Sequence, residues 1–108
     1  MKKKIREKDL QKQIKDYLTL QGFVVVKFAS VGIYNPVRKQ FIPQSRKGVS
    51  DLLACSPKGR FYAIEVKTGY NKPTEEQLDF LQEVNDRGGI GIVAYSLEDV
   101  ENVIRTSQ

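Results

Sequence analysis

Residues 47–69 read KGVSDLLACSPKGRFYAIEVKTG, and this stretch decides the fold. Two apolar segments, SDLLAC and FYAIEVK, flank the turn-forming residues SPKGR, so we expect two antiparallel strands joined as a hairpin. Strand-forming sequences usually carry their charges at the ends, but here Asp51, Glu65 and Lys67 surround the most apolar part of the chain. That placement indicates a functional site at one end of the hairpin.

Three charged side chains are expected to meet there. Side chains alternate along a strand, so Glu65 and Lys67 share one face with the small Ala63. In an antiparallel hairpin, Asp51 at the start of the first strand lies near the Glu65–Lys67 end of the second. Two carboxylates can hold Mg²⁺ or Mn²⁺, and a neighbouring lysine can orient water or neutralise charge. Gly48 would let the backbone pass close to a ligand. For Glu65 and Lys67 alone, an exposed ion pair is the alternative interpretation.

The residues before this hairpin predict a helix over 5–21, because Leu10, Ile14 and Leu18 recur at the spacing of one helical face. Glu7 lies three residues before Leu10 and therefore on the same apolar stripe. An acid on that stripe needs a partner, and we expect it close to the metal site. A favourable position near the positive end of the helix dipole is the alternative.

The rest of the chain completes an α/β pattern. FVVVKF at 23–28 predicts a strand, and the Asn35-Pro36 turn predicts a hairpin or ordered loop within about 29–47. A helix follows to about Arg87, then a strand (IGIVAY) and a last helix (SLEDVENVIR). The expected order is α-β-β-β-α-β-α with one inserted hairpin or loop, which gives a mixed sheet flanked by helices.

A capping box begins the helix after the hairpin. Thr74 is the expected N-cap, and Gln77 at the third helical position would bond back to it. Gln77 also precedes Leu78, Leu81 and Val84, which we expect to face inward, so it could instead face the acidic site. The sequence leaves both roles of Gln77 open.

Composition limits the chemistry. A chain of 108 residues is expected to form one domain, residues 1–108, and it contains no histidine. Serine–histidine and cysteine–histidine catalysis, and nearly all zinc chemistry, are therefore excluded. The single cysteine, Cys55, is expected in the core; it excludes an internal disulfide and suits the reducing cytoplasm. The basic N-terminus has no apolar run behind it, so we do not expect a secretory signal or a membrane span.

Charge is distributed unevenly. Residues 1–47 carry a net charge of +9, and residues 48–108 carry −4. A basic half joined to an acidic half suits a polyanion held against a metal site, although a solvated basic surface is equally compatible. The expected phosphate contacts are Lys2, Lys3, Lys4, Arg38, Lys39, Arg46 and Lys47.

The pattern GVSDL followed by IEVKTG resembles the PD-(D/E)XK nuclease superfamily, and within it the chain resembles a stand-alone VRR-NUC domain of the phage type. The resemblance covers almost the whole chain, from EKDLQ in the first helix through QLDFL to the closing GGIGIVAYSLEDV. Ser50 stands where the superfamily pattern nominally has proline. The resemblance implies a restriction-endonuclease-like fold.

It also implies roles for the candidate residues. Asp51 and Glu65 would be metal ligands, with the Val66 backbone carbonyl as a further oxygen ligand. Lys67 would be the catalytic lysine, and Gln77 would support the active site. The first-helix acid, Glu7, would lie near the metal, directly or through water.

The implied activity is Mg²⁺- or Mn²⁺-dependent hydrolysis of DNA phosphodiester bonds. Small members are expected to be homodimers that cut branched DNA such as four-way (Holliday) junctions, inside a bacterial host. The alternatives are a nuclease of linear or flap DNA and a non-catalytic DNA-binding module on the same fold. Sequence-specific restriction is less suited to this length, since reading base edges needs additional elements.

Overall fold

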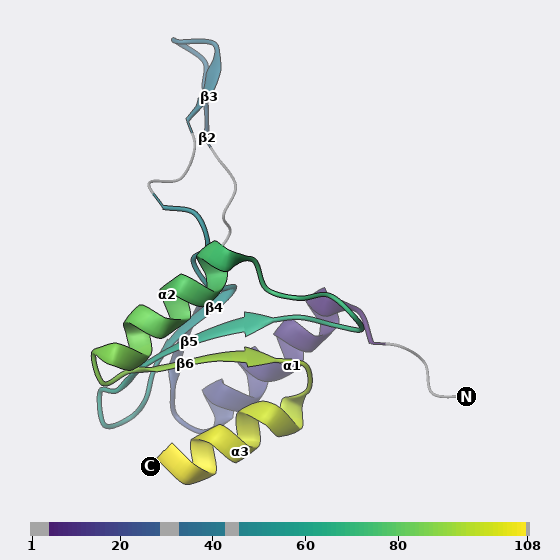
Figure 1. Ribbon diagram of the computed structural model, residues 1–108, viewed down its shortest axis with the longest axis vertical. Coiled ribbons are helices and arrows are strands. Elements are labelled where there is room, and N and C mark those ends of the chain that lie inside the picture. Colours follow the sequence, from purple (N-terminus) through teal and green to yellow (C-terminus); the bar gives the residue numbers. More distant parts are fainter. Residues whose placement is uncertain (1–4, 29–32, 43–45, 108) are drawn as a thin grey trace.

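The computed structural model describes residues 5–28, 33–42 and 46–107 (Figure 1). Its elements, in chain order, are α1 (Glu7–Leu20), β1 (Val24–Lys27), β2 (Ile33–Asn35), β3 (Gln40–Ile42), β4 (Leu52–Cys55), β5 (Phe61–Val66), α2 (Glu75–Asp86), β6 (Ile90–Ala94) and α3 (Leu97–Ser107). This order confirms the α/β prediction, with β2 and β3 as the inserted hairpin.

The main sheet is mixed and has the strand order β1-β4-β5-β6. β4 and β5 form the expected antiparallel hairpin, in which Leu52 lies opposite Ile64. β1 pairs antiparallel with the other side of β4, whereas β6 runs parallel to β5. Parallel strands require a crossover connection, and α2 supplies it.

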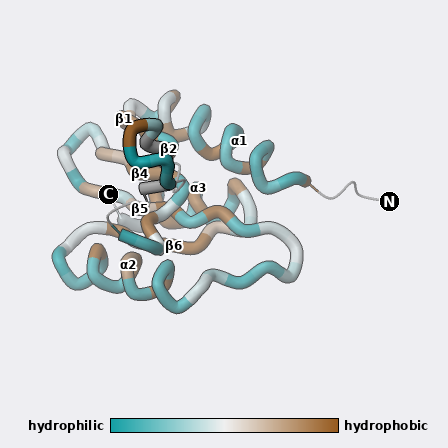
Figure 2. The backbone as a smooth tube through the Cα atoms, turned by 90° about the horizontal axis from the view of Figure 1, so that it is seen from above, coloured by the Kyte–Doolittle hydropathy of each residue, from teal (hydrophilic) through white to brown (hydrophobic). Residues whose placement is uncertain are grey.

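Two helices cover one face of this sheet and a third covers part of the other (Figures 1 and 2). The predicted stripe of α1 is buried, since Leu10, Ile14 and Leu18 are at most 1% exposed. On the opposite face α2 packs on β5 and β6, and it buries Leu81. Leu78, which we expected to face inward, is instead 48% exposed. No helix in the described part of the chain is long and apolar enough to span a membrane.

Because α2 covers only half of its face, apolar side chains remain exposed beside it on β1, β4 and the start of β5. Val24 and Val26 are 70% and 55% exposed, and Phe61 is 43% exposed. Val24, Cys55 and Phe61 lie side by side across the three strands, and Val26 lies beside Leu53 in the next row on the same face. We call the surface formed by these five residues the apolar sheet face. It corrects our expectation for Cys55, which is exposed here because no helix packs above it.

The β2–β3 hairpin stands away from the body of the molecule (Figure 1). Its strands pair antiparallel, with Asn35 opposite Gln40. The connecting residues 36–39 are exposed, and they include Arg38 and Lys39. Lys39 has a φ of 53°, as expected for a residue in a tight turn.

Candidate active site

Asp51 lies immediately before β4 and is fixed between two neighbouring strands. Its carbonyl oxygen accepts a hydrogen bond of 2.7 Å from the N–H of Phe28, which follows β1. Its carboxylate oxygen Oδ2 accepts a hydrogen bond of 2.9 Å from the N–H of Val66, near the end of β5. The side chain is therefore directed at the segment that carries Glu65 and Lys67.

Glu65 is buried in the sheet beneath α2, with only 1% of its surface exposed. Its Oε1 atom accepts a hydrogen bond of 3.1 Å from Gln77 Nε2 and lies 3.6 Å from Lys67 Nζ. Burial, and then the neighbouring Asp51 carboxylate, raise the pKa of Glu65 to about 8, against the lowering effect of the Lys67 ammonium group. The structure thus brings Asp51, Glu65, Lys67 and Gln77 together.

Two buried side-chain oxygens have no hydrogen-bond partner among the described residues: Glu65 Oε2 and Ser50 Oγ. An unpaired buried polar atom is costly, so such atoms mark positions where a ligand or water completes the site. Ser50 was not among our candidate residues. Its position directly before Asp51 is the only sequence signal that could have suggested it.

Gln77 takes both of the roles that the sequence left open. Its backbone N–H donates to Thr74 Oγ1 at 3.2 Å, and its Oε1 accepts from the Thr74 N–H at 2.8 Å, which completes the capping box. The amide nitrogen of the same side chain remains available, and it donates to Glu65. One residue therefore starts α2 and holds the buried acid.

Gly48 approaches protein backbone rather than a ligand, which corrects our expectation. Its φ is +84°, and a Cβ atom there would lie 2.4 Å from the carbonyl carbon of Glu76 and 2.8 Å from the nitrogen of Gln77. Only glycine fits this position without displacing the first turn of α2. The segment before Asp51 is thereby packed directly against the residue that holds Glu65.

Glu7 does not lie in the cluster formed by Asp51, Glu65, Lys67 and Gln77. Within the described residues, no three acidic or cysteine side chains lie in an arrangement suited to a metal ion. Glu7 is partly exposed at the first position of α1. Its place near a metal, and that of the Val66 carbonyl, therefore remain predictions.

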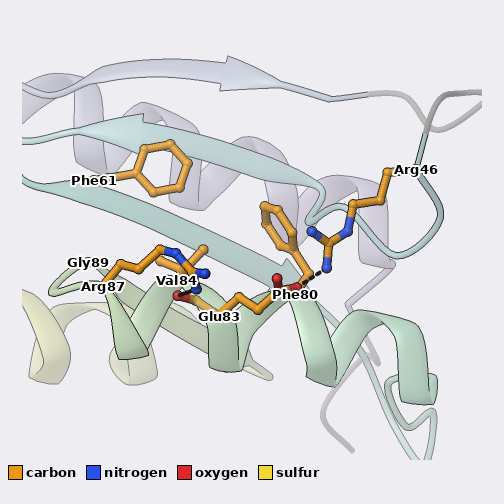
Figure 3. A pocket seen from close by; sticks show the side chains of 7 residues that line it. All are labelled: Arg46, Phe61, Phe80, Glu83, Val84, Arg87 and Gly89. Carbon is orange, nitrogen blue, oxygen red and sulfur yellow. Dashed lines mark hydrogen bonds and ion pairs between the residues drawn. The ribbon is translucent and has the colours of Figure 1, made fainter.

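The expected phosphate contacts lie in different environments. Lys2, Lys3 and Lys4 lie outside the described residues, and Lys47 is exposed. Arg46 is already engaged within the protein: it pairs with Glu83 on α2, and its guanidinium lies 5.1 Å from the centre of the Phe80 ring (Figure 3). These three side chains also line a pocket of about 360 Å³, which lies between α2 and Phe61 at the start of β5. This arrangement argues against Arg46 as a free phosphate-binding side chain.

The donor set of the cluster suits a hard divalent cation. Such ions prefer carboxylate and carbonyl oxygens, and Asp51 and Glu65 provide two carboxylates with one oxygen that has no partner in the described residues. The Asp51 carboxylate raises the pKa of Glu65, and a cation that neutralises both acids would remove the repulsion between them.

Comparison with known proteins identifies the family to which this fold belongs. Residues 4–98 match the family model of the VRR-NUC domain. The chain belongs to the VRR-NUC family. A solved structure described as a VRR_NUC domain is 27% identical in sequence, with a TM-score of 0.69 over 92% of this chain and 94% of that one. No curated protein matches the chain. VRR-NUC domains are nuclease-type domains, which makes DNA the natural partner of this one.

Proposed function

We propose that this VRR-NUC domain is a Mg²⁺- or Mn²⁺-dependent endonuclease that hydrolyses phosphodiester bonds in branched DNA such as four-way junctions. The observation that carries the proposal is the Glu65 carboxylate, which is buried between Asp51, Lys67 and Gln77 and has one oxygen without a partner in the described residues. A buried carboxylate with a raised pKa beside a second acid and a lysine is typical of a catalytic centre.

Asp51, Glu65 and the Val66 carbonyl would hold the cation, and Glu7, which lies outside the cluster, would assist through water. When bound, Mg²⁺ or Mn²⁺ polarises a phosphoryl oxygen and lowers the pKa of a coordinated water. Glu65 must be ionised for this role, so its raised pKa makes cation binding compete with proton binding.

The remaining residues position groups and neutralise charge. Gln77 fixes the orientation of the Glu65 carboxylate, and the Val66 N–H fixes that of Asp51. The side chain of Lys67 is 14% exposed, so its ammonium group can reach a phosphate at the protein surface. There it would neutralise developing negative charge or orient the attacking water.

We further propose that the enzyme acts as a homodimer in the cytoplasm. Resolving a four-way junction requires two cuts, and the described chain carries one acidic cluster, so a second copy would supply the second cut by two-fold symmetry. The apolar sheet face is the surface we assign to the second copy. An exposed, contiguous apolar patch of this kind is typical of a protein–protein interface.

The decisive experiment compares cleavage of a labelled four-way junction and a matched linear duplex in Mg²⁺, Mn²⁺ or EDTA. Asp51→Ala and Lys67→Ala should each reduce cutting at least about 100-fold. The exposed residues Asp79 and Lys72 provide matched control variants, Asp79→Ala and Lys72→Ala, which should cut as the wild type does.

Each alternative has its own outcome. Cutting that survives EDTA or both active-site substitutions would eliminate the proposed chemistry. Equal cutting of junction and linear duplex would leave a nuclease without junction preference. Tight DNA binding without cutting in any metal would identify a non-catalytic DNA-binding module.

A further inference from the structure

A groove on the α1 side of the molecule is lined by lysine and glutamine side chains, whose aliphatic stems and the neighbouring Leu52 form much of its surface. It has a volume of about 340 Å³, and its lining residues are Lys8, Gln11, Lys12, Lys15, Lys27 and Leu52. None of these lysines was among our predicted phosphate contacts. We call this feature the lysine groove.

The four lysines of the groove lie on two neighbouring elements, α1 and β1. Lys8, Lys12 and Lys15 are spaced by four and three residues, so they lie on one face of α1. Lys27 ends the neighbouring strand β1, and buried Leu52 forms the apolar floor. At a rise of 1.5 Å per residue, the helical lysines extend over roughly 10 Å, which is about three base-pair steps of duplex DNA.

The groove reaches the end of the sheet at which Asp51 lies. Lys27 lies opposite Leu52 in the β1–β4 ladder, and Leu52 directly follows Asp51. The N–H of Phe28, the residue after Lys27, is hydrogen-bonded to the carbonyl oxygen of Asp51. Leu52 faces α1 whereas Glu65 lies on the α2 face of the sheet, so a polyanion held in the groove would pass round the ends of β1 and β4 to reach the acidic cluster.

Little within the protein neutralises these charges. Lys12 pairs with Asp16 at 2.8 Å, but both side chains are more than half exposed, so the pair contributes little to stability. Among the described residues, Lys8, Lys15 and Lys27 have no ion-pair partner. Their mutual repulsion is relieved when a polyanion binds.

We propose that the lysine groove binds the sugar–phosphate backbone of the DNA substrate and directs it to the acidic cluster. This inference rests on the proposed nuclease function and assigns the path of one DNA strand to α1 and β1. Contacts of this kind position DNA without reading its sequence, as junction recognition requires.

The test removes three exposed charges and measures DNA binding directly. The variant is Lys8→Gln/Lys15→Gln/Lys27→Gln, and the matched control is Lys58→Gln/Arg87→Gln/Arg105→Gln, which removes the same charge elsewhere. Fluorescence anisotropy would follow binding of a labelled four-way junction in EDTA, at KCl concentrations from about 50 to 300 mM. The thermal unfolding midpoint of each protein shows that it is folded.

The groove variant should bind about tenfold or more weakly at about 50 mM salt, and its slope of log K against log[salt] should be smaller by about 2 to 3 than that of the wild type. The control should retain most of the affinity. Equal affinity and slope for the two triple variants would overturn the inference, even if the wild type cuts DNA normally.

Two further outcomes separate this inference from the proposed function. A wild type that neither binds nor cuts any DNA would overturn both. A wild type that prefers a matched RNA duplex, with that preference lost in the groove variant, would show that the groove is built for a different nucleic acid and would overturn the assignment to DNA.

Discussion

The carboxylate of Asp51 accepts a hydrogen bond of 2.9 Å from the backbone N–H of Val66, the residue between Glu65 and Lys67. The two acids and the lysine are therefore linked through the backbone, and not only by their charges. Asp51 fixes the end of β5 on which the other two residues are carried, so it combines a structural contact with the proposed binding of a cation.

Two substitutions at Asp51 should separate these contributions. Asp51→Asn retains an oxygen that can accept the Val66 N–H, whereas Asp51→Ala leaves that buried donor without a partner, at a cost of about 1–3 kcal/mol. We expect both variants to lose cutting at least about 100-fold, but only Asp51→Ala to lose stability. Urea unfolding and single-turnover cleavage measure the two effects, and equal stability of the two variants would contradict the positioning role.

Stability of the metal-free protein should depend on Glu65. Its folded pKa of about 8 lies above the ordinary value of 4.5, so the folded state holds the proton more tightly than the unfolded chain does. This contribution is complete below about pH 4.5 and is lost as the pH rises through about 8. Its size is on the order of a few kcal/mol.

Urea unfolding in EDTA between about pH 5 and pH 9 tests this dependence. Glu65→Gln should remove most of the decline across this range while abolishing cutting, and the exposed Glu101→Gln should leave the wild-type curve unchanged. Binding of Mg²⁺ or Mn²⁺ by the wild type should tighten over the same pH range. An identical decline in Glu65→Gln would show that the buried acid is not its source.

Gly48 should be far less tolerant of alanine than other glycines with similar backbone geometry. Gly59 has a φ of +88°, and a Cβ added there would have no atom within 4 Å, so Gly59→Ala isolates the cost of the left-handed backbone, about 1–2 kcal/mol. Gly48→Ala adds a clash with the backbone of Glu76 and Gln77. We expect a further loss of about 1–3 kcal/mol.

The clash should also reduce cutting, because it displaces Gln77 from Glu65. Activity measured well below the unfolding midpoint would show this loss for Gly48→Ala and not for Gly59→Ala. If both variants cut equally well, the contact between residue 48 and α2 does not support the site.

The apolar sheet face should determine the oligomeric state. Val24→Glu/Val26→Glu places two charges in its centre and should convert a dimer into a monomer in sedimentation equilibrium, since both side chains are already largely exposed in a single chain. Leu20→Glu, at a residue that is 85% exposed outside this face, is the matched control. A wild type that is monomeric at micromolar concentration, or a double variant that remains dimeric, would contradict the assignment.

Much of the fold could be predicted because its signals are local. Leu10, Ile14 and Leu18 mark the buried stripe of α1, and the capping box marks the first residue of α2. The proximity of Asp51 to Glu65 follows from a short turn between two strands, which permits only a few registers. These features need no knowledge of distant segments.

The features that the sequence did not predict depend on contacts between distant segments. Cys55 and Leu78 lie in apolar patterns but are exposed. Cys55 is exposed because α2 packs on β5 and β6 and leaves the same face of β4 uncovered. Arg46 pairs with Glu83, which is 37 residues away. The lysine groove likewise arises only when β1 packs beside α1, although the spacing of Lys8, Lys12 and Lys15 could have suggested its helical half.

The double use of Gln77 restricts how this position can vary. Glutamate, the other common residue at the third position of a capping box, would preserve the start of the helix but set a third acid against Glu65. Alanine would remove the cap and the support together. A substitution of Gln77 therefore affects both the start of α2 and the orientation of the Glu65 carboxylate. A homologue that replaces Gln77 should carry a compensating change at residue 65 or 74.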